Sequence, residues 1–325
     1  MNTISDIGER NLIQIASAIY HKDSEFDFTD DCAILPVNDE YLLATTDMIS
    51  EKTHVPKGMT PWDVGWFIVA INLSDIAAKG GYPIGLLLSI GLPSSYEESS
   101  FVDLIKGAHS CATRYKTSII GGDTKEQEYV VLSGTALGKV RKNLIMTRNG
   151  AKPGDAVAVT GTLGKAAAGF YTLKQTEKTD KKNPLCRPQP RIKEGQLLAK
   201  TMKVHCCMDI SDGLSSSLYQ LAELNDVGFE IDQKKLPISP ALFDHAKNDS
   251  TIDELYSSLH FGGDYELLFT APKKDMPILN EALHSYDTSL TVIGRVSKDK
   301  KIQLLTLEND TILLPNLGYE HFKNI

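Results

Sequence analysis

The spacing of apolar positions in the first half of the chain predicts helices that alternate with short strands. Helical spacing occupies three segments, which are residues 5–20, 61–79 and 96–115. Pro61 suits a first helical turn, Gly80-Gly81 ends that long helix, and a serine is expected to cap the third helix. Strand-like runs lie at residues 32–35, 41–46, 84–90, 117–120 and 129–139. These elements predict a mixed sheet with helices.

A turn-rich stretch at residues 148–155 separates this region from a second periodic region, because Gly150 and Pro153-Gly154 favour tight turns. The elements expected after it are strands at 156–160, 204–208, 228–231, 265–270 and 290–296, and helices after Gly164, at 191–200 and from 212. The polar tract 174–187 predicts an exposed loop or a frayed helix end. We therefore predict an α/β (α+β) protein with two domains, residues 1–145 and 146–325.

Composition narrows the classes of function. A chain of 325 residues has room for two hydrophobic cores. Its formal net charge of −8 argues against a general nucleic-acid binder and offers no attraction to anionic membranes. The longest apolar stretch, residues 84–92, is too short to cross a bilayer, and residues 1–20 lack the apolar core of a signal peptide. The cysteines are odd in number and form no CxxC pair, so we expect a reduced, cytoplasmic protein.

Acidic residues at the predicted ends of apolar strands are the most informative chemical feature. Asp47, Asp123 and Asp209 each follow such a run, and Asp31 and Asp75 lie near short apolar segments. Carboxylates repel one another, so a cluster of them requires cations. Hard oxygen ligands favour Mg²⁺, Mn²⁺ or Ca²⁺ over zinc, and protein-bound Mg²⁺ often carries substrate phosphates. The pattern therefore predicts an enzyme of phosphoryl transfer.

Each motif also has a simpler structural interpretation. Asp47 could cap a helix or form an Asx-turn, Gly121-Gly122-Asp123 could be a hairpin turn, and Asp212 could cap the helix that follows it. The stretch from Gly161 to Lys165 lacks the spacing of a Walker phosphate loop. No HExxH or GxSxG pattern occurs, which argues against a zinc protease and a serine hydrolase. The order of the acidic and glycine-containing motifs along the chain is more specific for one protein family than any single motif.

That order resembles the thiamine-monophosphate kinases, within the superfamily of aminoimidazole ribonucleotide synthetase. The matching segments span nearly the whole chain and are Asp30-Asp31-Cys-Ala, Thr45-Thr46-Asp47, His54, Asn72-Leu-Ser-Asp75, Gly121-Gly122-Asp123-Thr124, Thr147-Arg148 to Asp155, Asp209-Ile-Ser-Asp212-Gly213, Asp264-Tyr-Glu-Leu-Leu-Phe269 and Gly318-Tyr319-Glu-His-Phe322. The resemblance implies the two-domain fold of that superfamily and a homodimer formed through the N-terminal halves. It also implies transfer of the γ-phosphoryl group of ATP to thiamine monophosphate, which gives thiamine diphosphate.

The resemblance also implies roles for individual residues. Implied Mg²⁺ ligands are Asp31, Thr45, Thr46, Asp47, Asp75, Asp123, Asp209 and Asp212, of which Asp47, Asp75, Asp123 and Asp212 are the expected catalytic set. Implied ATP contacts are Gly122, Asp123, Arg148 and Ser211. Implied contacts to thiamine monophosphate are His54, Tyr319 and position 263. At that position the chain departs from the family, because Gly263 stands where the family carries a substrate-contacting Glu.

The chemistry supports this interpretation independently. The acceptor is a phosphate oxygen that is already anionic near pH 7, so the reaction needs no general base. Metal ions can neutralise two polyanions and align them for direct transfer, without a phosphoenzyme. Two alternatives remain, another ATP-using member of the superfamily and a nucleotide-binding sensor. A selenophosphate synthetase should carry a reactive Cys or selenocysteine near its N-terminus, but residues 1–30 contain no Cys. A hydrogenase-maturation relative should end in a Cys-bearing tail, whereas this chain ends in Phe322-Lys-Asn-Ile325.

Overall fold

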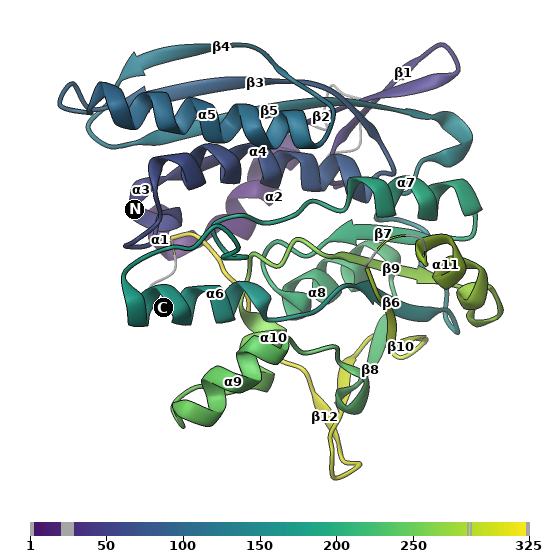
Figure 1. Cartoon of the computed structure of the whole chain (residues 1–325). Helices are drawn as coiled ribbons and strands as arrows, with labels where there is room; N and C mark the ends of the chain where they lie inside the picture. The colour runs from purple at the N-terminus through teal and green to yellow at the C-terminus, as the bar shows by residue number, and fades with distance from the viewer. Residues whose placement is uncertain (1–2, 21–28, 285, 287, 323–325) are drawn as a thin grey trace.

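The computed structural model describes residues 3–20, 29–284, 286 and 288–322, which form two sheets with helices between and around them (Figure 1). The first sheet has five strands in the order β1-β2-β5-β3-β4. Their bounds are Ala33–Val37 (β1), Glu40–Ser50 (β2), Tyr82–Leu92 (β3), Ile119–Glu126 (β4) and Val131–Arg141 (β5). Neighbouring strands are antiparallel except β3 and β4, which are parallel. The mixed α/β class is therefore confirmed.

Helices α4 (Pro61–Ala78) and α5 (Glu98–Arg114) cover one face of this sheet (Figure 1). Thr60 and Asp63 form a capping box at the start of α4, and Pro61 occupies its first turn. Helix α4 is apolar on all sides because it contacts the first sheet on one side and α7 (Ile192–Thr201) and β7 (Cys206–Asp209) on the other. This position buries the polar residues near its C-terminal end, Asn72 and Ser74.

The second sheet has seven strands in the order β12-β11-β8-β10-β6-β9-β7. Beyond β7, its strands are Ala156–Thr160 (β6), Gly228–Asp232 (β8), Leu267–Ala271 (β9), Leu290–Ser297 (β10), Ile302–Leu305 (β11) and Thr311–Leu313 (β12). The remaining helices of this half are Lys165–Thr176 (α6), Leu214–Asn225 (α8), Pro240–Asn248 (α9), Glu254–His260 (α10) and Met276–Leu283 (α11). Strand β6 has the predicted bounds, and α6 extends into the polar tract as far as Thr176. The tract is mostly exposed up to residue 182, but the prediction of an exposed loop is wrong at Asn183 and Cys186, which are buried.

Local differences from the predicted elements have local causes. The first helix is divided at Gly8, which has a φ of 78°, into α1 (Ile4–Ile7) and α2 (Glu9–Tyr20). The predicted serine cap of α5 is wrong, since Glu97 occupies the N-cap and makes no side-chain capping bond. Asp212 does not cap α8 either, because Gly213 occupies that N-cap position.

Asp47 and Asp123 lie inside strands rather than at strand ends. Strand β2 continues to Ser50 because Ser50 still pairs with Val131 of β5. Strand β4 continues to Glu126 through parallel pairing with β3. The predicted strand ends were therefore too early, and Asp209 alone of the three lies at the end of its strand as expected.

The face of the first sheet that points away from α4 and α5 is left open by the described elements (Figure 1). Met48 is 65% exposed on it, and Leu87 of β3 is also exposed. No helix in the described part of the chain has the length and apolar character that crossing a membrane requires.

Candidate active site

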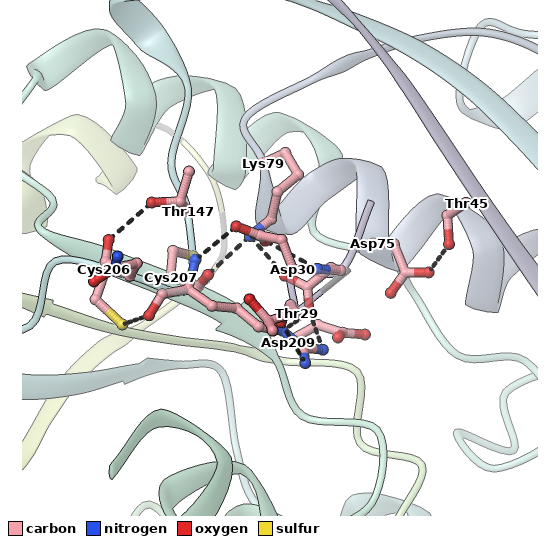
Figure 2. Close-up of polar contacts among 12 residues, drawn as sticks. Thr29, Asp30, Thr45, Asp75, Lys79, Thr147, Cys206, Cys207 and Asp209 are labelled. Carbon is pink, nitrogen blue, oxygen red and sulfur yellow. Dashed lines mark hydrogen bonds and ion pairs between the residues drawn. The ribbon is translucent and has the colours of Figure 1, made fainter. Parts of the chain in front are cut away.

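Three carboxylates from distant parts of the chain meet between the two sheets. Asp31 precedes β1, Asp75 lies in the last turn of α4, and Asp209 ends β7. One oxygen from each lies within 4.8 Å of the others. Two of these residues, Asp75 and Asp209, are labelled in Figure 2. This arrangement brings together residues that the sequence analysis assigned to a metal site.

Asp47 and Asp212 belong to the same acidic group. Burial, followed by the charges of Asp212 and Asp31, raises the pKa of Asp47 to about 6. Burial also raises the pKa of Asp212 to about 6, with Glu9 as the next contributor. Because these carboxylates are partly buried and close together, the negative charge of each makes ionisation of the next less favourable. We call Asp31, Asp47, Asp75, Asp209 and Asp212 the acidic cluster.

The pKa shifts are also upward at Asp75 and Asp209. Burial and then the charge of Asp47 place the pKa of Asp75 well above its usual value. Burial and then the charge of Asp31 raise the pKa of Asp209 to about 7. Cations bound among these oxygens would reverse such shifts, since opposite charge favours the ionised carboxylate.

Asp31 differs from the rest because it has cationic partners. Lys79 has no exposed side-chain surface, and its ammonium forms ion pairs with Asp30 and, at 2.7 Å, with Asp31. Arg148 donates from Nε to Asp31 Oδ1 at 2.6 Å. Burial alone would raise the pKa of Asp31, but the charges of Arg148 and Lys79 outweigh it and lower the pKa. The sequence analysis missed Lys79, whose signal was a single charge between the apolar end of α4 and Gly80.

Hydroxyl groups extend the acidic cluster on the helix side of the first sheet. Thr45 donates to Asp75 Oδ2 at 2.5 Å, and Ser74 donates to Asp209 Oδ2 at 2.5 Å. The side chain of Thr46 points to the opposite face, where its hydroxyl donates to the carbonyl of Gly134 at 2.9 Å. Alternation along β2 places Thr45 and Asp47 on one face and Thr46 on the other. The structure therefore brings Thr45 to the cluster but not the hydroxyl of Thr46.

The structure does not bring Asp123 to the acidic cluster within this chain. Asp47, Gly134, Leu88 and Gly122 form one row across the sheet, on the face that α4 and α5 cover. Asp123 follows Gly122 in β4, so its side chain points to the open face. It is exposed there, with Lys125 Nζ at 3.7 Å.

Gly122 lines a groove of about 660 Å³ beside α5. Apolar side chains of the sheet and of α5, including Leu88, Phe101 and Ile105, form much of its wall. Gly122 has a φ of 156°, and a Cβ there would meet the Leu88 carbonyl oxygen at 1.8 Å. Two of the predicted ATP contacts, Gly122 and Asp123, thus border this groove, although the Asp123 side chain points to the open face. Arg148 lies instead beside the acidic cluster.

An aromatic group borders the acidic cluster. His54, which ends α3 (Glu51–His54), lies 6.3 Å from Tyr319 and 5.1 Å from His321 between ring centroids. The backbone N–H of Tyr319 donates to the carbonyl of Asp212 at 3.3 Å. Burial, followed by the charge of His321, lowers the pKa of His54 to about 4, so the imidazole is neutral near pH 7. The structure thus brings together the two predicted substrate contacts His54 and Tyr319.

The backbone of the 263–266 segment pairs with the segment that carries Asp209 and Asp212. Gly263 donates to the carbonyl of Ser211 at 2.6 Å, so the predicted ATP contact Ser211 is held at this pairing. Gly263 has a φ of 93°, a conformation that a Glu would adopt only with strain. Its ideal Cβ position is 3.3 Å from the Ala166 Cβ.

Tyr265 is a further residue at the site that the sequence analysis missed. Its φ of 50° is a left-handed conformation that a bulky residue rarely adopts. Its neighbours Asp264 and Glu266 turn the other way. Asp264 accepts a hydrogen bond from Ala166 N in α6, and Glu266 accepts one from Thr160 Oγ1 at the end of β6. The Tyr265 ring instead packs edge-on against Phe67 of α4, at 6.2 Å. Burial and then the charge of Asp47 raise the pKa of its hydroxyl, which places Tyr265 beside the acidic cluster.

The N-terminal helix α2 also reaches this region, which its amphipathic pattern did not indicate. Arg10 donates to the Ser216 hydroxyl at 2.9 Å, and Glu9 accepts from the His321 backbone at 2.9 Å. These contacts join α2, α8 and the C-terminal segment next to Asp212.

Two family models and several curated proteins match most of the chain. Residues 29–140 match the family model of AIR synthase related protein, N-terminal domain, and residues 152–306 match the C-terminal domain. A thiamine-monophosphate kinase of Methanospirillum hungatei is 37% identical over 96% of this chain and 99% of its own length. The thiamine-monophosphate kinase of Escherichia coli K12 is 34% identical, over 92% of this chain and 93% of its own.

Solved structures match the fold of this chain as well. The structure of AaThiL complexed with AMPPCP and TMP has a TM-score of 0.86 and 29% identity, and covers 99% of each chain. Thiamine-monophosphate kinase from Stenotrophomonas maltophilia has a TM-score of 0.75 and 31% identity, over 90% of this chain and 95% of that one. From the two domain matches, these relatives and the order of acidic motifs at the site, we conclude that the chain belongs to the thiamine-monophosphate kinase family.

Proposed function

We propose that this protein transfers the γ-phosphoryl group of ATP to thiamine monophosphate and produces thiamine diphosphate. The names of its relatives support this activity, among them one that is 37% identical over nearly the whole chain. The observation that carries the proposal is the contact between two unlike groups, an acidic cluster and an aromatic pair. Tyr319 joins them through its backbone bond to Asp212. An aromatic face suits a flat, partly cationic substrate, and the carboxylates suit a metal-bound phosphate.

The donor set of the acidic cluster fits Mg²⁺. Its atoms are carboxylate and hydroxyl oxygens, which hard divalent cations prefer. Asp47, Asp75, Asp209, Asp212 and Thr45 would hold the ions. When bound, Mg²⁺ neutralises phosphate charge and aligns the attacking and leaving oxygens. Asp123 and Thr46, which face away within this chain, remain candidate ligands by resemblance only.

The protein groups then have mainly binding and positioning roles. Arg148 is held between Asp31 and Gln220, and a fifth of its side chain stays exposed, so it can donate to a phosphate of ATP. Ser211 and Gly122 are the further proposed nucleotide contacts, with the groove beside α5 as the proposed place for the base. His54 and Tyr319 would orient the thiamine moiety. We propose direct in-line transfer, because the acceptor phosphate already carries negative charge.

We also propose that the chain comprises two domains, residues 1–145 and 146–325, and that it is a cytoplasmic homodimer. The open face of the first sheet supports the dimer, since Met48 and Leu87 are exposed on it. A second copy is the occupant that the family resemblance implies for this surface.

Incubation with ATP and Mg²⁺ in the presence of separate acceptors tests the activity. We expect ADP to form with thiamine monophosphate, and not with thiamine or aminoimidazole precursors. Turnover with an aminoimidazole precursor alone would favour another activity of the superfamily. ATP binding without any turnover would favour the nucleotide-binding sensor. Labelled protein recovered after reaction with γ-labelled ATP would contradict direct transfer.

A further inference from the structure

Lys79 places a permanent positive charge in the protein interior. It follows directly after α4, at the C-cap, and its side chain has no exposed surface. An unpaired ammonium in such a position would be strongly destabilising, because burial removes its hydration. Lys79 is therefore bound to its anionic partners in the folded state.

The partners of Lys79 come from both halves of the chain. Its ammonium pairs with Asp30, which precedes β1, and donates to the carbonyl of Cys207 in β7 at 3.0 Å (Figure 2). It also pairs with Asp31. Asp30 also accepts from the backbone N–H of Arg148 at 3.1 Å. Lys79 thus lies where the first half, the second half and Arg148 meet.

Both oxygens of Asp31 are engaged by these cations. Oδ1 accepts from Arg148 Nε at 2.6 Å, and Oδ2 faces the Lys79 ammonium at 2.7 Å, as an ion pair without hydrogen-bond alignment. In the described part of the chain, no ion pair with Lys or Arg reaches the remaining members of the acidic cluster, which are Asp47, Asp75, Asp209 and Asp212. The site therefore has one end where Lys79 and Arg148 form ion pairs and one end where no such ion pair forms among the described residues, although the charge of Arg148 still acts on Asp209 and Asp212.

We propose that Lys79 is a resident cation of the acidic cluster, which means a protein charge in the place of a bound ion. Its ammonium compensates the negative charges of Asp30 and Asp31, as a bound divalent ion compensates those of the other carboxylates. It orients Asp31 toward Arg148, so Lys79 is a positioning residue. Asp31 is then withdrawn from the metal ligands, although one of its oxygens lies within 4.8 Å of oxygens of Asp75 and Asp209. Divalent ions occupy the end formed by Asp47, Asp75, Asp209 and Asp212. This inference rests on the proposed metal-dependent function and deepens it.

The contrary interpretation is that Lys79 only fastens the two halves together. A structural fastener would leave the number of bound ions unchanged when it is removed. A resident cation would be replaced by an added ion, because Asp30 and Asp31 would regain their need for positive charge.

The test compares Lys79→Met with Lys165→Met. Methionine retains the length and the apolar body of lysine but not its charge. Lys165 is a matched control, since it pairs with buried Glu266, which also keeps an arginine partner, Arg191, at 2.6 Å. In each variant a buried carboxylate loses its lysine partner and keeps one arginine partner. Only Lys79, however, contacts the acidic cluster.

Two measurements on the full chain without nucleotide decide the matter. Thermal unfolding is recorded with EDTA and with Mg²⁺, and bound Mn²⁺ is counted by equilibrium dialysis. For Lys79→Met we expect a larger Mg²⁺-induced rise in Tm than for the wild type, by roughly 3 °C or more, since ligand binding stabilises the folded state. We also expect about one additional Mn²⁺ per chain. Lys165→Met should show the wild-type response in both measurements.

The double variant Lys79→Met with Asp30→Asn covers the case in which Lys79→Met fails to fold. It removes one positive and one negative charge together, so we expect it to fold in EDTA and to bind the wild-type number of Mn²⁺ ions. An unchanged Mn²⁺ count in Lys79→Met, or equal Mg²⁺ rescue of Lys165→Met, would overturn the proposal, as would failure of the double variant to fold. Ion counting needs no turnover, so a wild-type protein inactive on thiamine monophosphate would refute only the proposed function.

Discussion

At the scale of single residues, charge and its compensation dominate the site. Burial raises the pKa values of Asp47, Asp209 and Asp212, whereas Asp31 escapes because Arg148 and Lys79 outweigh its burial. The resemblance assigned similar metal-binding roles to these aspartates. Their surroundings in the structure differ, because Asp31 forms ion pairs with protein cations and the others form none within the part of the chain that the structure describes.

Asp47→Asn should abolish turnover and leave the fold intact. The substitution keeps the shape of the side chain and removes one ligand charge, which should cost several kcal/mol of transition-state stabilisation. The same change relieves repulsion in the metal-free protein, so Tm in EDTA should not fall. Steady-state rates at saturating Mg²⁺ and thermal unfolding provide the check. Turnover close to that of the wild type would show that Asp47 is not an essential ligand.

Tyr319→Ala should raise KM for thiamine monophosphate several-fold and leave KM for ATP nearly unchanged. Loss of an aromatic face against a cationic ring costs about 0.5–2 kcal/mol. Tyr319→Phe retains the face and should be mild. A large fall in Tm with unaltered substrate affinity would instead assign Tyr319 a structural role at the C-terminal segment.

The Mg²⁺-induced rise in Tm should be larger at pH 8 than at pH 5.5. The folded-state pKa values of Asp47 and Asp212, about 6, and of Asp209, about 7, lie above the ordinary value of 3.8. These groups therefore favour the folded state below about pH 4, and this contribution is lost as pH rises through 6 to 7. Mg²⁺ competes with the same protons, so it stabilises most where they have left. Equal shifts at the two pH values would contradict this site as the place of binding.

At the scale of elements, close approach of α4 and α5 shapes the first half. A Cβ on Gly65 would meet the carbonyl oxygen of Leu104 at 1.9 Å, and one on Gly107 would meet that of Trp62 at 1.9 Å. Glycine at these two positions therefore lets the helices pack backbone against backbone. Because α4 also carries Asp75 and is followed by Lys79, the packing that positions α4 positions the site.

Gly65→Ala should destabilise the protein by roughly 2–4 kcal/mol, since two backbones must separate to admit one methyl group. Urea unfolding in EDTA measures the change. Gly154→Ala is the matched control, because nothing lies within 4 Å of its Cβ position and only its φ of 94° opposes the substitution. We expect the control to cost about 1 kcal/mol. Equal losses in the two variants would mean that helix packing is not the cause.

At the scale of the whole molecule, the open face of the first sheet and the placement of Asp123 belong together. Asp123 lies on that face, with Met48 and Leu87, and not with the acidic cluster. A surface with exposed apolar side chains on paired strands is typical of a protein interface. The proposed homodimer would cover it.

Light scattering at micromolar concentration should give the mass of a dimer, about twice 35.7 kDa. Met48→Asp should shift the mass toward the monomer, because it places a charge on the open face. Ile312→Asp on β12 is the control, since Ile312 is also exposed but lies on the other sheet. A monomeric mass for the wild type would contradict the dimer.

The sequence by itself determined the local elements and the family. Helix α4 follows from its apolar spacing, its first-turn proline and its glycine stop, and the order of the acidic motifs was sufficient to recognise the relatives. Tertiary structure decided where side chains point and which charges meet. Pairing with β5 extends β2 past Asp47, alternation turns Asp123 to the open face, and burial pairs Lys79 with Asp30 and Asp31. These outcomes depend on strand register and desolvation, which arise from contacts between segments far apart in the chain, whereas periodicity reports only on neighbouring residues.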